Sequence, residues 1–105
     1  MLRKTTEHTR GIFTLRECRY DSKLTEISFY VSPCLPGAGP VLRGVVSRQG
    51  PGCKYVAYTN LRNRVAIGLK KETVIAATIA EIERDMHQDG SLRFYQQAGS
   101  QNRQI

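Results

Sequence analysis

The spacing of apolar residues changes once along this chain, and that change limits the folds open to it. Ile75, Ile79, Ile82 and Met86 recur every three or four residues, which is the period of one face of an α-helix. Before them, apolar residues alternate with polar ones, as in a strand with one buried face. The sequence therefore predicts an amphipathic helix over residues 73–87 that follows a set of strands.

The ends of this helix have recognisable signals. Thr73 is a residue type that caps helix N-termini, and Glu72 places an anion where the helix dipole favours one. Gly90 can adopt the positive φ that ends a helix. Beyond it, residues 91–96 alternate Leu92 and Phe94 with polar residues, which predicts a final edge strand.

Five segments before the helix have the composition of β-strands. Leu24–Val31 alternates most clearly, with Ile27, Phe29 and Val31 on one face. Residues 49–52 predict a tight reversal, because Pro presets φ and Gly permits a positive φ. The predicted strands are 11–19, 24–31, 41–48, 53–60 and 64–69, separated by turns at 20–23, 49–52 and 60–63 and by a Pro- and Gly-rich loop at 32–40.

Together these elements predict an α+β fold. Five to six short antiparallel strands, arranged as two hairpins plus a third strand, pack against one amphipathic helix near the C-terminus. The length of 105 residues suits one domain with one core, which we expect to span residues 10–96. Residues 1–9 are polar and without pattern, so we expect a flexible tail there and a second one at 97–105.

The orientation of two strands bears on function. In 64–69 the alternation predicts Val65, Ile67 and Leu69 inward, with Arg62, Arg64 and Lys70 outward. In 53–60, Tyr55 and Tyr58 are three residues apart and so face opposite sides of the sheet. The pattern leaves open which of the two is exposed.

Charge is distributed unevenly along the chain. No Asp or Glu occurs from Ile27 to Lys71. Residues 1–71 hold 13 Lys and Arg against 4 acids, and residues 72–105 hold 3 against 5, which together give the net charge of +7. Such an asymmetry creates a positive field that concentrates polyanions at one surface.

Residues 52–83 resemble a known type of domain. Two tyrosines on the middle strand precede a basic turn, a Gly68-Leu69 step and a helix that contains Ala76, Ala77 and Ala80. This order resembles the arm-site DNA-binding domains of phage-type tyrosine recombinases and is similar to plant-type AP2 domains. The resemblance implies a sheet that reads DNA and a helix that supports it. The predicted nucleic-acid contacts are Arg43, Arg48, Lys54, Tyr58, Arg62, Arg64, Lys70 and Lys71.

Two alternatives stand beside DNA binding. The basic strands also suit a solvated surface, since Lys and Arg on sheet edges discourage aggregation. They also suit a small protein inhibitor or modulator, for example from a phage or other mobile element, that docks its basic face or a sheet edge near residues 92–96 on an acidic protein surface. DNA is favoured over RNA, and homodimers through an unpaired edge strand are compatible with either function.

Nothing in the sequence predicts catalysis or a cofactor. His8 lies in the expected tail and His87 at a helix end, and no Cys/His or Ser/His/Asp set can be assembled. Alternate acids on a helix point apart, so those in 81–85 do not predict a metal site. The odd number of cysteines (Cys18, Cys34 and Cys53) predicts reduced, packed thiols in a cytoplasmic protein without a membrane span.

Overall fold

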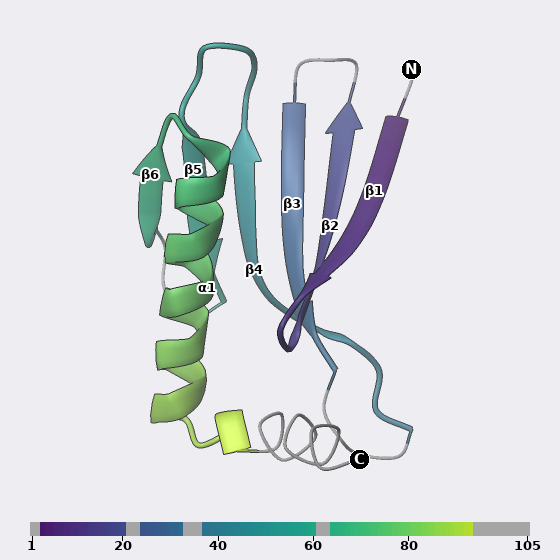
Figure 1. Ribbon diagram of the computed structural model, residues 1–105, viewed down its shortest axis with the longest axis vertical. Helices are drawn as coiled ribbons and strands as arrows, with labels where there is room; N and C mark the ends of the chain where they lie inside the picture. The colour runs from purple at the N-terminus through teal and green to yellow at the C-terminus, as the bar shows by residue number, and fades with distance from the viewer. Residues whose placement is uncertain (1–2, 21–23, 33–36, 61–63, 94–105) are drawn as a thin grey trace.

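The computed structural model describes residues 3–20, 24–32, 37–60 and 64–93, and forms one antiparallel sheet with one helix (Figure 1). The six strands lie side by side in chain order. This architecture confirms the predicted α+β fold. The elements are β1 (Arg3–Arg10), β2 (Phe13–Tyr20), β3 (Leu24–Val31), β4 (Val41–Arg48), β5 (Tyr55–Thr59), β6 (Ala66–Gly68) and α1 (Lys71–Gln88).

The clearest sequence patterns mark the elements most closely. Both β3 and β4 begin and end at the predicted residues. The reversal after β4 is a turn in which the Cys53 amide donates a hydrogen bond to the Gly50 carbonyl at 3.0 Å, and Gly52 has φ +82°. Pro51 supplies the fixed negative φ of such a turn, and Gly52 adopts its positive φ without strain. Residues 21–23 of the predicted turn at 20–23, residues 61–63 of the predicted turn at 60–63 and the tail at 97–105 lie outside the described residues.

The expectation of a loose tail over residues 1–9 is wrong for the part that the structure describes. β1 pairs with β2 along its whole length, from Arg3 opposite Tyr20 to Arg10 opposite Phe13. It buries little, because every side chain from Lys4 to Thr9 is exposed. An edge strand like this one is held by its backbone ladder, so it needs no apolar face that periodicity could reveal.

The helix begins earlier than predicted. Its N-cap is Lys70, which makes no side-chain capping bond, so Thr73 lies inside the first turn instead of capping it. The other end agrees with the sequence, since α1 stops at Gln88 and Gly90 has φ +79°. The predicted strand at 91–96 is wrong where it can be checked, because Leu92 and Arg93 are helical, and residues 94–96 are not described.

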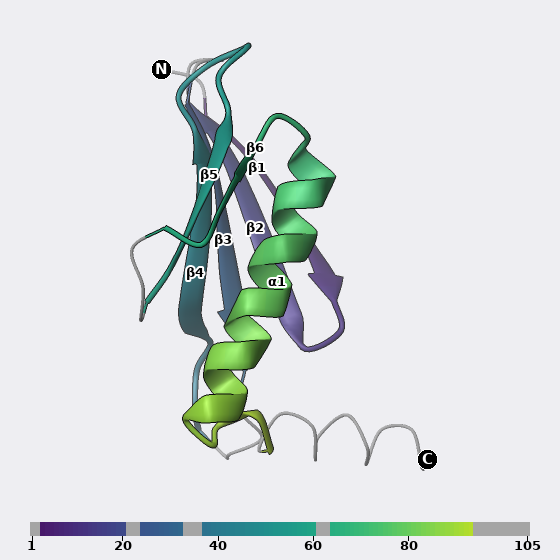
Figure 2. The same ribbon diagram turned by 90° about the vertical axis from the view of Figure 1, so that its left-hand side faces the viewer.

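α1 crosses one face of the sheet diagonally, and the hairpin end of β1 and β2 curls toward it (Figure 2). The core lies between this helix-side face and α1, and Phe29, Leu15 and Ile82 in it are fully buried. Gly44 allows the close contact, because a Cβ there would lie 2.9 Å from the Tyr58 carbonyl oxygen and 3.0 Å from Ile82 Cδ1. A larger residue would push the helix away from β4.

The predicted orientation of 64–69 is right for Val65, which packs against the core, and for Arg64, which is exposed, but wrong for Ile67 and Leu69. Ile67 and Leu69 are 51% and 65% exposed, whereas Ala66 packs against the core. A Cβ on Gly68 would lie 3.2 Å from Val74 Cγ2, so the inward side of this strand has room only for small residues. The first turn of α1 lies so close to β6 that it decides which face of the strand points inward. The alternation of aliphatic residues alone predicts the opposite face.

Among the described residues, no helix, α1 included, is both long enough and apolar enough to cross a bilayer.

Candidate nucleic-acid interface

Strand register brings cations from distant parts of the chain into one row. Lys4 lies directly opposite Arg19, Arg19 opposite Thr25, and Thr25 opposite Arg48. Side chains directly opposite one another point to the same face, and Thr25 is buried on the helix side. The row therefore places three cations on the helix-side face at one end of the sheet, the upper end in Figure 1.

The start of α1 adds cations at the same end. Lys70 is exposed at the N-cap, Lys71 follows it, and Lys54 is exposed just before β5. The unpaired amide groups of the first turn give the helix N-terminus a partial positive charge, which no side-chain cap removes and which Glu72 in the same turn offsets in part. We call this surface the basic end, which consists of Lys4, Arg19, Arg48, Lys54, Lys70 and Lys71.

A hollow of about 260 Å³ lies between β1, β2 and the first turn of α1. Lys4 and Arg19 line it from the strands and Lys71 from the helix, and among the described lining residues Glu17 is the one acid. Three permanent positive charges around one carboxylate leave a surplus of positive charge in a concave space. The remaining lining residues, Thr6 and His8, can donate hydrogen bonds to an anion.

Glu17 fixes two of these cations in place. Its side chain is only 9% exposed, and its two oxygens lie 3.2 Å from Arg19 Nε and 3.2 Å from Lys71 Nζ. The Arg19 side chain is 57% exposed and that of Lys71 is 32% exposed, so both keep donors available to a ligand. Glu17 thus orders the walls of the hollow before any ligand arrives.

Two further contacts hold neighbouring cations. The Arg48 guanidinium stacks on the Tyr55 ring, with its Cζ 4.7 Å from the ring centroid. Tyr55 is buried, which answers the question that the sequence left open, because Tyr58 is then the exposed one. Nearby, Arg10 bonds to Glu72, and this hydrogen bond lowers the pKa of the Glu72 carboxyl.

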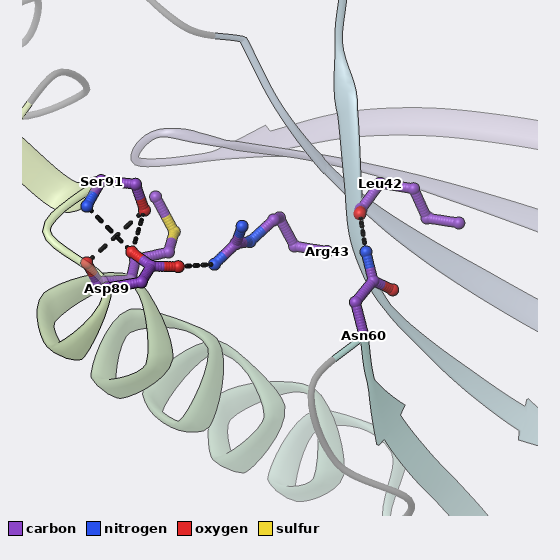
Figure 3. A network of polar contacts seen from close by, with 6 residues as sticks. Leu42, Arg43, Asn60, Asp89 and Ser91 are labelled. Atoms are coloured by element: carbon purple, nitrogen blue, oxygen red, sulfur yellow. Dashed lines mark hydrogen bonds and ion pairs between the residues drawn. The ribbon is translucent and has the colours of Figure 1, made fainter.

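Arg43 is not available at the basic end. It is the extra residue of a β-bulge in β4, because Phe29 pairs with Gly44 and Tyr30 with Leu42. Its guanidinium donates a hydrogen bond to Asp89 Oδ2 at 3.1 Å, just beyond the C-terminus of α1 (Figure 3). Arg43 therefore ties the sheet to the opposite end of the helix.

Ser91 completes this contact. Its hydroxyl and its backbone amide donate to Asp89 Oδ1 at 2.5 and 2.9 Å (Figure 3). These two bonds, with a smaller contribution from Arg43, hold the pKa of Asp89 below its usual range. In the same view the Asn60 side chain donates to the Leu42 carbonyl and joins the end of β5 to β4.

The lowered pKa of Asp89 predicts a pH-dependent contribution to stability. Ionised Asp89 stabilises the fold fully above its unfolded pKa of about 4, and this contribution is lost as pH falls through the lower folded value. Asp89→Asn should therefore be less stable than the wild type at neutral pH, with a difference that shrinks in acid. Urea unfolding across a pH series checks this, and a difference that stays constant into strong acid would contradict it.

The sheet face opposite α1, which we call the open face, differs from the expected basic surface. Tyr58 lies there and is 43% exposed. Four of the predicted contacts gather at the basic end, namely Arg48, Lys54, Lys70 and Lys71. Arg43 is bound to Asp89. Arg64 is exposed beyond the far end of β5. Arg62 lies outside the described residues. The free face of the sheet and its cationic surface are thus different places.

Sequence reasoning missed Lys4 and Arg19. Lys4 lies in the segment predicted to be a tail, and Arg19 lies before the acid-free stretch of residues 27–71. The threonines of β1 were a weak signal, since β-branched residues favour strands.

The cysteine prediction was partly right, because Cys18 is buried as expected and Cys53 is exposed. Cys34 is not described.

Within the described ranges, His, Cys, Asp and Glu side chains do not gather in threes at metal-binding spacing. Comparisons of the chain with protein-family models, with characterised proteins and with solved structures found no match.

Proposed function

We propose that this protein binds nucleic acid through its basic end, without catalysing a reaction, and that duplex DNA is the preferred ligand. The observation that carries the proposal is the cross-strand pair of Lys4 and Arg19, which faces Lys71 across the hollow. Two cations directly opposite each other on neighbouring strands repel and weaken the free protein. A phosphate between them turns that repulsion into attraction.

The spacing of the row suits a phosphate backbone. Neighbouring strands are about 4.8 Å apart, so Lys4, Arg19 and Arg48 follow one another over about 15 Å. DNA presents one negative charge per about 3.4 Å of each strand, so such a row can contact several phosphates at once. The uncapped N-terminus of α1 adds amide donors of the kind that bind phosphates elsewhere.

DNA is favoured over RNA by the resemblance of residues 52–83 to DNA-binding domains. Contacts to phosphates set affinity and position, whereas sequence is read from base edges. The proposal therefore concerns backbone binding and does not name a target sequence.

Fluorescence anisotropy tests the proposal. Labelled duplex DNA, single-stranded DNA and structured RNA are titrated with the protein over a salt series. With about six phosphate contacts, the logarithm of the association constant should fall with log salt at a slope of about −5 on duplex DNA. Absence of binding to all three ligands at low salt would overturn the proposal, and an acidic protein surface would then be the better candidate for the basic end.

A further inference from the structure

The open face carries a continuous apolar patch that the basic end does not explain. Val45 lies directly opposite Tyr58, and Val56 opposite Ile67, so these side chains adjoin across β4, β5 and β6. Leu42 extends the patch and pairs with Tyr30 of β3. Tyr58, Ile67 and Leu42 are 43%, 51% and 37% exposed. We call Leu42, Val45, Val56, Tyr58 and Ile67 the apolar patch.

The charge of the open face argues against a polyanion there. Its charged side chains at described strand positions are Glu7, Arg16 and Glu26, which sum to −1, and counting Lys54 just before β5 brings the sum only to zero, in a protein of net charge +7. Arg16 is already engaged, since it bonds to Glu7 at 3.1 Å and its guanidinium lies over Tyr30. None of the five residues of the apolar patch is a cation. Phosphates would gain little on this face, because it carries no net positive charge.

The same charge distribution favours a second copy of this chain. Two proteins of net charge +7 repel strongly if their basic ends meet. The open face is the surface on which two copies can approach with the least repulsion, and an apolar patch is complementary to itself under two-fold symmetry. The cations of the basic end that lie on the helix side of the sheet or on α1 then stay outside the contact.

The size of the face is sufficient. At about 4.8 Å between strands and about 3.3 Å per residue, the six strands cover about 600 Å² of flat sheet, and projecting side chains expose more than this. Stable interfaces bury about 600–1,000 Å² on each partner, so this face lies at the lower end of that range before side chains are counted. The apolar patch would form the centre, and the Thr and Ser side chains of β1 to β3 the polar rim that such interfaces have.

We propose that the open face binds the open face of a second copy, so that two sheets pack face to face with α1 on the outside of each. Sheets packed in this way lie about 10 Å apart and bury both inner faces. This inference does not depend on nucleic-acid binding, because it rests on a different face of the sheet.

Sedimentation equilibrium tests the inference. The protein is treated with nuclease and measured in high salt, at protein concentrations from low micromolar to several hundred micromolar. The wild type should reach twice the monomer mass. Tyr58→Lys combined with Ile67→Lys should raise the dissociation constant at least about tenfold, equivalent to about 1.4 kcal/mol, because it buries two cations against an apolar surface. Both positions are exposed, so circular dichroism should show the monomer fold retained.

Ala77→Lys combined with Ala80→Lys is the matched control, since it adds the same charge on the exposed side of α1. This variant should dimerise like the wild type. A wild type that stays monomeric throughout would overturn the inference. Equal dissociation constants for the two double variants would also overturn the inference, because the contact between copies would then not lie on the open face.

Discussion

Replacing Lys4, Lys54 and Lys70 together with glutamate should weaken binding to duplex DNA at least about 100-fold near 0.1 M salt. Each phosphate contact contributes a factor of about 8 at that salt relative to 1 M, and each reversal adds repulsion. The salt slope should fall by about three. All three side chains are exposed, so the fold should tolerate the change. Anisotropy titrations at several salt concentrations measure both effects.

The control compares two single reversals that change net charge equally. Lys70→Glu alters the basic end, whereas Arg84→Glu alters the solvent side of α1, where the Arg84 side chain is 64% exposed. Lys70→Glu should reduce affinity and salt slope, and Arg84→Glu should change both much less. Equal losses would mean that only total charge matters, and an unchanged affinity in the triple variant would remove the basic end as the contact surface.

Phe29→Ala should lower the free energy of unfolding by about 3–5 kcal/mol, because it leaves a large cavity in the centre of the core. Phe29 is fully buried and lies between Leu15 and Gly44 on the neighbouring strands, under α1. A loss of this size is a large fraction of the stability of a small domain, so the variant should be partly unfolded at room temperature. Urea unfolding followed by circular dichroism measures it.

Tyr30→Ala is the matched comparison, since Tyr30 is the next residue on the same strand and points to the open face. It removes a ring of similar size from a half-buried position, so it should cost only about 1 kcal/mol. A cost equal to that of Phe29→Ala would contradict the assignment of the two faces. Both measurements belong at low protein concentration, where self-association contributes least.

The sequence predicted those elements whose burial repeats with the period of their backbone. β3 has a buried face between two neighbouring strands, so its apolar residues alternate and its limits can be read directly. The limits of β4 follow instead from the Pro- and Gly-rich segments on either side of it. The apolar stripe of α1 is visible for the same reason. β1 lies at the edge and buries almost nothing, so no pattern of apolar residues marks it.

β6 shows how a clear pattern can mislead. Val65, Ile67 and Leu69 alternate as an inward face should, yet Ile67 and Leu69 are exposed. The inward side is restricted by the approach of Val74 to Gly68, a contact made only when α1 docks. Alternation identifies two faces of a strand but does not say which one is covered.

The basic end could be predicted only in part. Lys70 and Lys71 stand out in the sequence as neighbours in an acid-free stretch. Lys4, Arg19 and Arg48 are separated by 15 and 29 positions and meet only through the ladder from β1 to β4. Register between strands is a property of the folded sheet, and no local pattern in the chain expresses it.

The order of the strands has a consequence for how the chain folds as the ribosome makes it. Each strand pairs with the one synthesised just before it, so the sheet can grow hairpin by hairpin with short loop closures. The apolar side of that growing sheet has no cover until α1 has left the exit tunnel. During this interval Phe29 and Val46 are exposed to water, and the nascent chain is open to aggregation and to chaperones. Slow translation of the codons for residues 71–88 would lengthen that exposure, whereas slow translation of the first hairpins would not.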